Sequence, residues 1–126
     1  RICSKIKENV VKEKKLTIYD YDDVWNSIIK NARLKSKKNI WFGGFVGYDD
    51  TPRRGKQGKI VKGESPKKFE KYLKQLKKIS ETQDKDFIFL TAWNEWGEGA
   101  YLEPDQDNKY EYLEALKRVV DDNEYN

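Results

Sequence analysis

The densest group of side chains that could do chemistry lies between Trp93 and Asp105, where Glu95, Glu98 and Glu103 alternate with aromatic and glycine residues. Aromatic rings can cover the apolar faces of a sugar, while carboxylates accept hydrogen bonds from its hydroxyls and transfer protons. Most glycosidases use such a pair of carboxylates. We interpret the segment as a candidate sugar site. The competing interpretation is a solvated acidic loop whose tryptophans belong to the core.

A second group of polar side chains occupies residues 47–55, with the sequence GYDDTPRRG. Only five of the 26 basic residues are arginine, and Arg53 and Arg54 are adjacent. A guanidinium binds phosphate or carboxylate through two parallel hydrogen bonds, which lysine cannot do. The pattern therefore predicts a substrate contact, with Tyr48 and Asp49 beside the arginines. It fits equally a structural clasp in which an aspartate pairs with an arginine.

The composition of the 126 residues excludes several kinds of chemistry. The sequence has no histidine and a single cysteine, so it contains no Ser–His or Cys–His pair, no imidazole ligand and no internal disulfide. Acid–base catalysis then falls to Glu, Asp, Tyr or Lys. No apolar run approaches the roughly 18 residues of a membrane span, so we predict no membrane span. We expect a cytoplasmic location because disulfides are absent.

The net charge of +4 hides an uneven distribution. Residues 1–92 carry 23 basic and 12 acidic side chains, whereas residues 93–126 carry 3 and 10. We attribute the excess to lysines on solvated helix faces. Nucleic-acid binding is the less favoured interpretation because no recognisable reading motif is present.

Hydrophobic spacing predicts the elements that position these side chains. Apolar stripes with a helical period indicate helices from residue 21 to about 34, over 66–80 and after 108. The second helix should begin at Ser65-Pro66, and the third at a capping box formed by Asn108 and Glu111. Apolar runs at 40–46 and 87–93 indicate buried strands, the later one covered on both faces.

This alternation predicts an α/β fold of parallel βα units, with the two strands adjacent and joined by a right-handed crossover through helix 66–80. We expect residues 47–64 to form a long polar loop. Residues 16–19 suggest a brief strand, and Cys3, Ile6, Val10 and Val11 a partial helical face. A start at Arg1 in a sequence without methionine suggests a piece of a longer protein.

The segments GYDDTPRRG, SPKKFEKYL and TAWNEWGEGAYLEPD resemble the C-terminal part of the WbsX-type glycosyltransferase family. That family is similar to the endo-α-mannosidase-like glycoside hydrolases (family 99). The resemblance covers about Tyr19 to Leu116. Tyr48 and Asp50 stand where the family pattern has tryptophan and asparagine.

The resemblance implies that residues 1–126 are the C-terminal part of one domain, the last βα units of a (β/α)₈ TIM-type barrel completed by sequence upstream of residue 1. It implies a carbohydrate-active enzyme that hydrolyses or transfers α-linked, mannose-like glycans in bacterial surface-polysaccharide metabolism. A non-catalytic carbohydrate-binding or scaffold domain is the alternative. No metal is implied, and we predict no cofactor.

In the hydrolase relatives the two glutamates of the NEWxEG motif are the catalytic pair, which assigns these roles to Glu95 and Glu98. The first removes a proton from the sugar 2-hydroxyl to give an anhydrosugar intermediate, and the second acts as general acid and then base. The sugar contacts are expected at Trp93, Asn94, Trp96, Tyr101, Tyr48, Asp49, Arg53 and Arg54.

The two catalytic carboxyls should converge within about 10 Å in one cleft, with an arginine of the neighbouring segment nearby. The remaining acids, Glu103 and Asp105, should steady the loop before the last helix.

Overall fold

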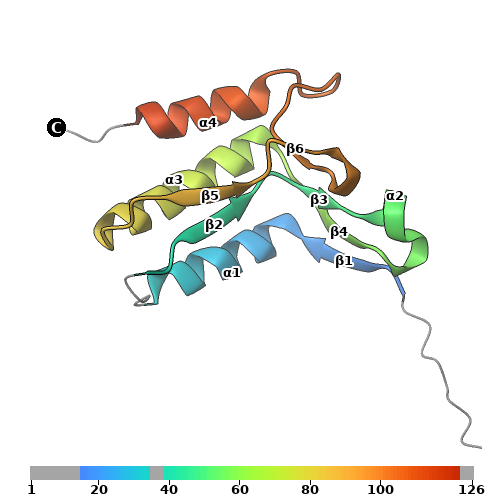
Figure 1. Ribbon diagram of the computed structural model, residues 1–126, viewed down its shortest axis with the longest axis horizontal. Coiled ribbons are helices and arrows are strands. Elements are labelled where there is room, and N and C mark those ends of the chain that lie inside the picture. Colours follow the sequence, from blue (N-terminus) through green and yellow to red (C-terminus); the bar gives the residue numbers. More distant parts are fainter. Residues whose placement is uncertain (1–14, 35–38, 123–126) are drawn as a thin grey trace, which may run out of the picture.

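The computed structural model describes residues 15–34 and 39–122, which form an α/β fold with parallel strands (Figure 1). Strands β2 (Phe42–Phe45) and β5 (Ile88–Thr91) pair in parallel, in a register that sets Phe42 opposite Ile88. Helix α3 (Pro66–Thr82) lies between them in the sequence, as predicted. The described residues contain no closed barrel.

The helices begin where the sequence predicts. Helix α1 (Tyr21–Arg33) is capped by Asp20, whose carboxylate accepts a hydrogen bond from the Asp23 amide at 3.0 Å. Helix α3 is capped by Ser65, whose hydroxyl accepts from the Lys68 amide at 3.2 Å. Both caps satisfy amide groups that the first helical turn leaves without partners.

Helix α4 (Glu111–Asp121) begins at the predicted place by a different route. The capping box is wrong, since Tyr110 holds the cap position and makes no side-chain cap hydrogen bond. The side-chain amide of Asn108 instead donates to the Asp105 carboxylate at 3.3 Å. Asp105 therefore holds the turn before α4, the role expected of it.

The prediction of a long loop over residues 47–64 is also wrong. This segment contains strand β3 (Tyr48–Asp49), the single helical turn α2 (Thr51–Arg54), the 3-10 turn η1 (Gly55–Gln57) and strand β4 (Lys59–Lys62). Strand β4 pairs in parallel with β1 (Thr17–Asp20), the brief predicted strand, and antiparallel with β3. Strand β4 escapes detection because its two apolar residues stand between lysines within a glycine-rich stretch.

The core lies between α1, α3 and one face of the β2–β5 pair. Trp25 is completely buried there, stacked between Phe45 and Tyr72 at centroid distances of 5.5 and 5.6 Å. The close approach of α1 requires Gly44, because a Cβ at that position would lie 2.7 Å from the Trp25 ring. Burial raises the pKa of the Tyr72 hydroxyl to about 12.

A polar clasp joins the starts of α1 and α3. The Asp22 carboxylate pairs with the Lys68 ammonium at 2.5 Å and accepts a hydrogen bond from the Tyr72 hydroxyl at 2.6 Å. The lysine contact, followed by the tyrosine contact, lowers the pKa of Asp22. These contacts join the first turn of α1 to the first two turns of α3.

The prediction that the second strand is covered on both faces is wrong for the described residues. Phe87 and Phe89 are 59% and 61% exposed, and Trp41 contacts both at centroid distances of 6.1 and 6.4 Å. We call Trp41, Phe87 and Phe89 the aromatic face. It lies opposite the helices, because side chains alternate across a strand and the Gly44 face points toward α1.

Cys3, Ile6, Val10 and Val11 lie outside the described residues. Among the residues that are described, no helix combines the length and apolarity that crossing a membrane requires.

Candidate active site

The segment richest in candidate residues folds as a hairpin directly after β5. Strands β6 (Asn94–Glu95) and β7 (Ala100–Tyr101) pair antiparallel around the 3-10 turn η2 (Trp96–Glu98). Gly99 closes the turn in the left-handed conformation, with φ of 58°, which glycine adopts without strain. Glu95 thus directly precedes one tight turn, and Glu98 is its last residue.

Main-chain hydrogen bonds fix the hairpin to the end of β5. The Ala92 amide donates to the Ala100 carbonyl at 3.1 Å, and the Trp93 carbonyl accepts from the amides of Leu102 and Glu103 at 2.9 and 3.0 Å. The hairpin therefore stands at the carboxyl end of the parallel pair. Ligand sites of parallel α/β folds lie at this end.

The fold brings the arginine segment against this hairpin. The Arg53 guanidinium of α2 donates to the Glu98 carboxylate and forms an ion pair with it. Two glycines allow the close approach: a Cβ at Gly99 would lie 3.2 Å from the Asp49 amide nitrogen, and a Cβ at Gly47 would lie 3.1 Å from the Gly99 carbonyl oxygen. An arginine of this segment therefore lies beside a candidate glutamate, and their contact with a common substrate stays a prediction.

The adjacent Arg54 points to a different partner. Its guanidinium pairs with the Asp50 carboxylate at 3.2 Å. The sequence left two roles open for the arginine pair: a contact with the substrate, or an ion pair with an aspartate that holds the segment. Arg54 makes the structural ion pair, and Arg53 contacts a candidate glutamate. Asp50, which is not among the predicted sugar contacts, is completely buried.

Tyr48 and Asp49 are held by their own neighbours. The Tyr48 hydroxyl donates to the Asp50 carboxylate at 3.1 Å, and the Asp49 carboxylate accepts from the amide and hydroxyl of Thr51 at 2.9 and 2.6 Å. Burial and the hydrogen bond to Asp50 raise the pKa of Tyr48, with a smaller contribution from the nearby Glu98 charge. One oxygen of the Asp49 carboxylate thus binds Thr51, the first residue of the α2 turn.

An aromatic stack forms the other side of the hairpin. The rings of Trp96 and Tyr101 lie 3.7 Å apart between centroids, at an interplanar angle of 16°. The Trp96 indole donates to the Glu103 carboxylate at 2.6 Å, and the Tyr101 hydroxyl donates to Asp105 at 3.0 Å. Hydrogen bonds from the Asn108 amide and then the Tyr101 hydroxyl keep the pKa of Asp105 low. Asp105 steadies the loop before α4 as predicted, whereas Glu103 holds Trp96 of the hairpin itself.

The remaining candidate residues, Trp93, Asn94 and Glu95, are exposed. They line an open surface in the described residues, where the sequence suggested a cleft. Glu98 is less accessible, with a side chain 24% exposed against 57% for Arg53. The surface combines one ion-paired carboxylate, one accessible carboxylate and an indole whose orientation is fixed. These groups can bind hydroxyl-rich ligands and exchange protons with them.

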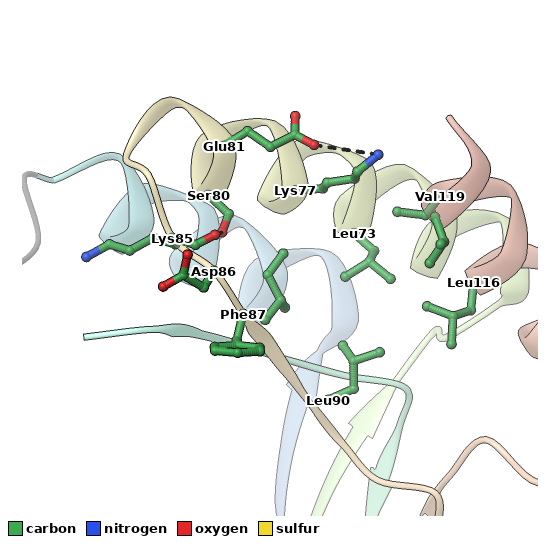
Figure 2. A pocket seen from close by; sticks show the side chains of 12 residues that line it. Leu73, Lys77, Ser80, Glu81, Lys85, Asp86, Phe87, Leu90, Leu116 and Val119 are labelled. Atoms are coloured by element: carbon green, nitrogen blue, oxygen red, sulfur yellow. Dashed lines mark hydrogen bonds and ion pairs between the residues drawn. The ribbon is translucent and has the colours of Figure 1, made fainter. Parts of the chain in front are cut away.

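A pocket of about 430 Å³ lies elsewhere, between α3, α4 and the start of β5 (Figure 2). Leu73, Leu90 and Leu116 form its apolar wall, and the Lys77–Glu81 ion pair lies at its rim. Neither Glu95 nor Glu98 lines this pocket, so it is separate from the candidate site on the hairpin. Among the described residues, no group of three or more cysteine or acidic side chains is placed to hold a metal ion.

Most of the chain is similar to known proteins. The model of the glycosyltransferase WbsX family matches residues 2–116. Proteins named uncharacterized protein WxcX from two strains of Xanthomonas campestris pv. campestris, B100 and ATCC 33913, are 35% identical over 101 residues. The match covers 76% of this chain and 14% of each relative, so the chain spans about one seventh of their length. No solved structure matches the chain.

Proposed function

Because the chain belongs to the WbsX glycosyltransferase family, we propose that it supplies the catalytic carboxylates of an enzyme that cleaves or forms α-linked, mannose-like glycosidic bonds. The observation that carries this proposal is the contact between Arg53 and Glu98. It joins the two segments that the sequence singled out, at the end of the parallel strands where such sites lie.

In this proposal Glu95 is the base that deprotonates the sugar 2-hydroxyl, and its exposure leaves it open to a substrate. Glu98 is the acid–base partner of the leaving oxygen. Since it is ion-paired with Arg53, the pair must loosen before Glu98 can carry a proton. A substrate group that binds Arg53 would achieve this. The fixed ring of Trp96 would provide an apolar surface for the sugar.

The test uses the full-length protein with two substrates. Incubation with α-linked mannobiose reports hydrolysis as free mannose, and incubation with GDP-mannose and an α-mannoside acceptor reports transfer as released GDP. We expect one of the two products. Neither product, together with saturable binding of mannobiose, would favour the carbohydrate-binding or scaffold alternative. Strong binding of DNA or RNA that weakens steeply with salt would favour the nucleic-acid alternative.

We also propose that upstream sequence of the same polypeptide covers the aromatic face and completes a (β/α)₈ barrel. In the described residues β2 and β5 pair only with each other, so each has a free edge. The pocket of Figure 2 adjoins the start of β5, and a smaller pocket lined by Ile28, Trp41 and Phe42 adjoins β2. A few βα units taken from a barrel would leave strand edges, pockets and an aromatic face exposed, because the neighbouring strands and helices normally cover them.

Phe89→Lys tests whether residues 1–126 are part of a barrel or a complete domain. In the full-length protein it should lower the midpoint of thermal unfolding, because burying a phenylalanine side chain is worth about 1.5–3 kcal/mol. In residues 1–126 expressed alone it should reduce self-association, measured by analytical ultracentrifugation. Tyr110→Lys, at a residue 62% exposed away from this face, is the matched control. A monomeric 126-residue chain that melts cooperatively would contradict the proposal.

A cytoplasmic location and action on bacterial surface polysaccharide belong to the same proposal. Fractionation of the source cells tests the first, and surface-glycan analysis of a deletion strain tests the second.

A further inference from the structure

Asp50 is a carboxylate with no exposed surface in a segment that otherwise lies near solvent. Burial of a charged group is costly unless hydrogen bonds and an opposite charge compensate for it. Asp50 has both, from three separate sources. Its oxygens accept from the Lys59 amide at 2.6 Å and the Tyr48 hydroxyl at 3.1 Å, and the Arg54 guanidinium lies at 3.2 Å.

These partners close residues 48–59 around Asp50. The Lys59 amide belongs to the start of β4 and the Tyr48 hydroxyl to β3. The Asp50 carboxylate therefore binds both ends of residues 48–59. The packing is tight, since a Cβ at Gly58 would lie 2.9 Å from an Asp50 carboxylate oxygen and 2.8 Å from a Thr51 methyl group. The pKa of the Asp50 carboxyl is lowered, chiefly by the hydrogen bond that it accepts from the Lys59 amide.

The main chain of Asp50 sets the direction of the two arginines. Its carbonyl accepts from the amides of Arg53 and Arg54 at 3.1 and 2.9 Å, which forms the single turn of α2. Arg54 folds back on the Asp50 side chain, and Arg53 projects from the same turn to Glu98. Because Arg54 is paired with Asp50, Arg53 is the arginine of this turn that contacts the candidate site.

We infer that Asp50 is a positioning residue: its buried carboxylate holds the α2 turn so that Arg53 meets Glu98. The inference deepens the proposed function, since Glu98 is the acid–base residue there. The contact between Arg53 and Glu98 can nevertheless be measured without turnover.

The experiment measures the rate at which phenylglyoxal modifies each arginine of the full-length protein, followed by mass spectrometry. Glu98→Gln gives the rate for an Arg53 without its charged partner. Asp50→Ala should raise the Arg53 rate to that level, about two- to fivefold, the range that the modest energy of an exposed ion pair allows. In the Glu98→Gln background, Asp50→Ala should add nothing further at Arg53.

Two internal controls separate positioning from general unfolding. Arg33 near the end of α1 and Arg118, which donates to Glu70 at 2.8 Å, should keep their rates. If both rise with Arg53, Asp50 only stabilises the fold and the inference fails. Asp50→Asn, which keeps an oxygen for the Lys59 amide, should give a smaller change and covers the case in which Asp50→Ala does not fold. An unchanged Arg53 rate in both variants overturns the inference.

A turnover arm links Asp50 to catalysis. With α-linked mannobiose, Asp50→Ala and Arg53→Ala should lower kcat/KM by the same factor, and the double variant by no more than either, because one acts through the other. Additive losses would overturn the positioning role. Absence of turnover in the unmodified protein would defeat the proposed function, while the labelling rates would still decide the role of Asp50.

Discussion

Glycan turnover is expected to fall by about 10²- to 10⁴-fold when Glu95 or Glu98 is replaced by glutamine in the full-length protein, the range for loss of one general acid or base. Glutamine keeps the size and hydrogen-bonding oxygen of the side chain and removes its proton transfer. At position 98 the substitution removes the ion pair with Arg53, whereas the main-chain hydrogen bonds that hold the hairpin should persist. The measurement is kcat and KM with α-linked mannobiose.

Glu114→Gln is the matched control for this pair, since Glu114 is an exposed glutamate on α4, outside the hairpin. It should leave both constants unchanged. Mannobiose affinity, measured by calorimetry, should survive in all three variants. Turnover that remains in both Glu95→Gln and Glu98→Gln would remove the catalytic assignment and leave the hairpin a binding or structural element.

The largest expected effect on stability comes from Trp25. Trp25→Ala should lower the free energy of unfolding by about 3–5 kcal/mol, the cost of truncating a large buried aromatic residue. The ring is fully buried and stacks on both Phe45 and Tyr72, so its loss leaves a cavity at the centre of the core. Gly44 packs against the same ring and cannot fill that space, because it has no side chain. Urea unfolding at neutral pH measures the difference.

Tyr110→Ala provides the comparison, because it also removes an aromatic ring but at a residue 62% exposed. It should change the free energy of unfolding by no more than about 0.5 kcal/mol. A loss at position 25 as small as that at position 110 would show that the core does not depend on the stacked rings.

The sequence by itself predicted the elements that have a strong local pattern. The stripe containing Trp25 gives α1, Ser65-Pro66 gives the start of α3, and the two apolar runs give β2 and β5 as a parallel pair. Such patterns work because helix and strand geometry repeats within a few residues along the chain. The motif around Glu95 and Glu98 likewise identified the family that the comparisons show.

The sequence did not predict β4 or the exposure of Phe89. The four residues of β4 are held by pairing with β1, which lies 42 positions earlier in register, and no local pattern encodes that partner. An apolar run is the same whether one face or both are covered. Which face is bare depends on the position of α1 and α3 relative to the strands.

The tertiary structure alone decided what each polar group of the site contacts. Arg53 and Arg54 are neighbours of one residue type, yet one pairs with Glu98, 45 positions away, and the other with the buried Asp50. The physical reason is that a side chain's partner depends on the direction in which its turn projects it. That direction is set here by the hydrogen bonds that close the chain around Asp50.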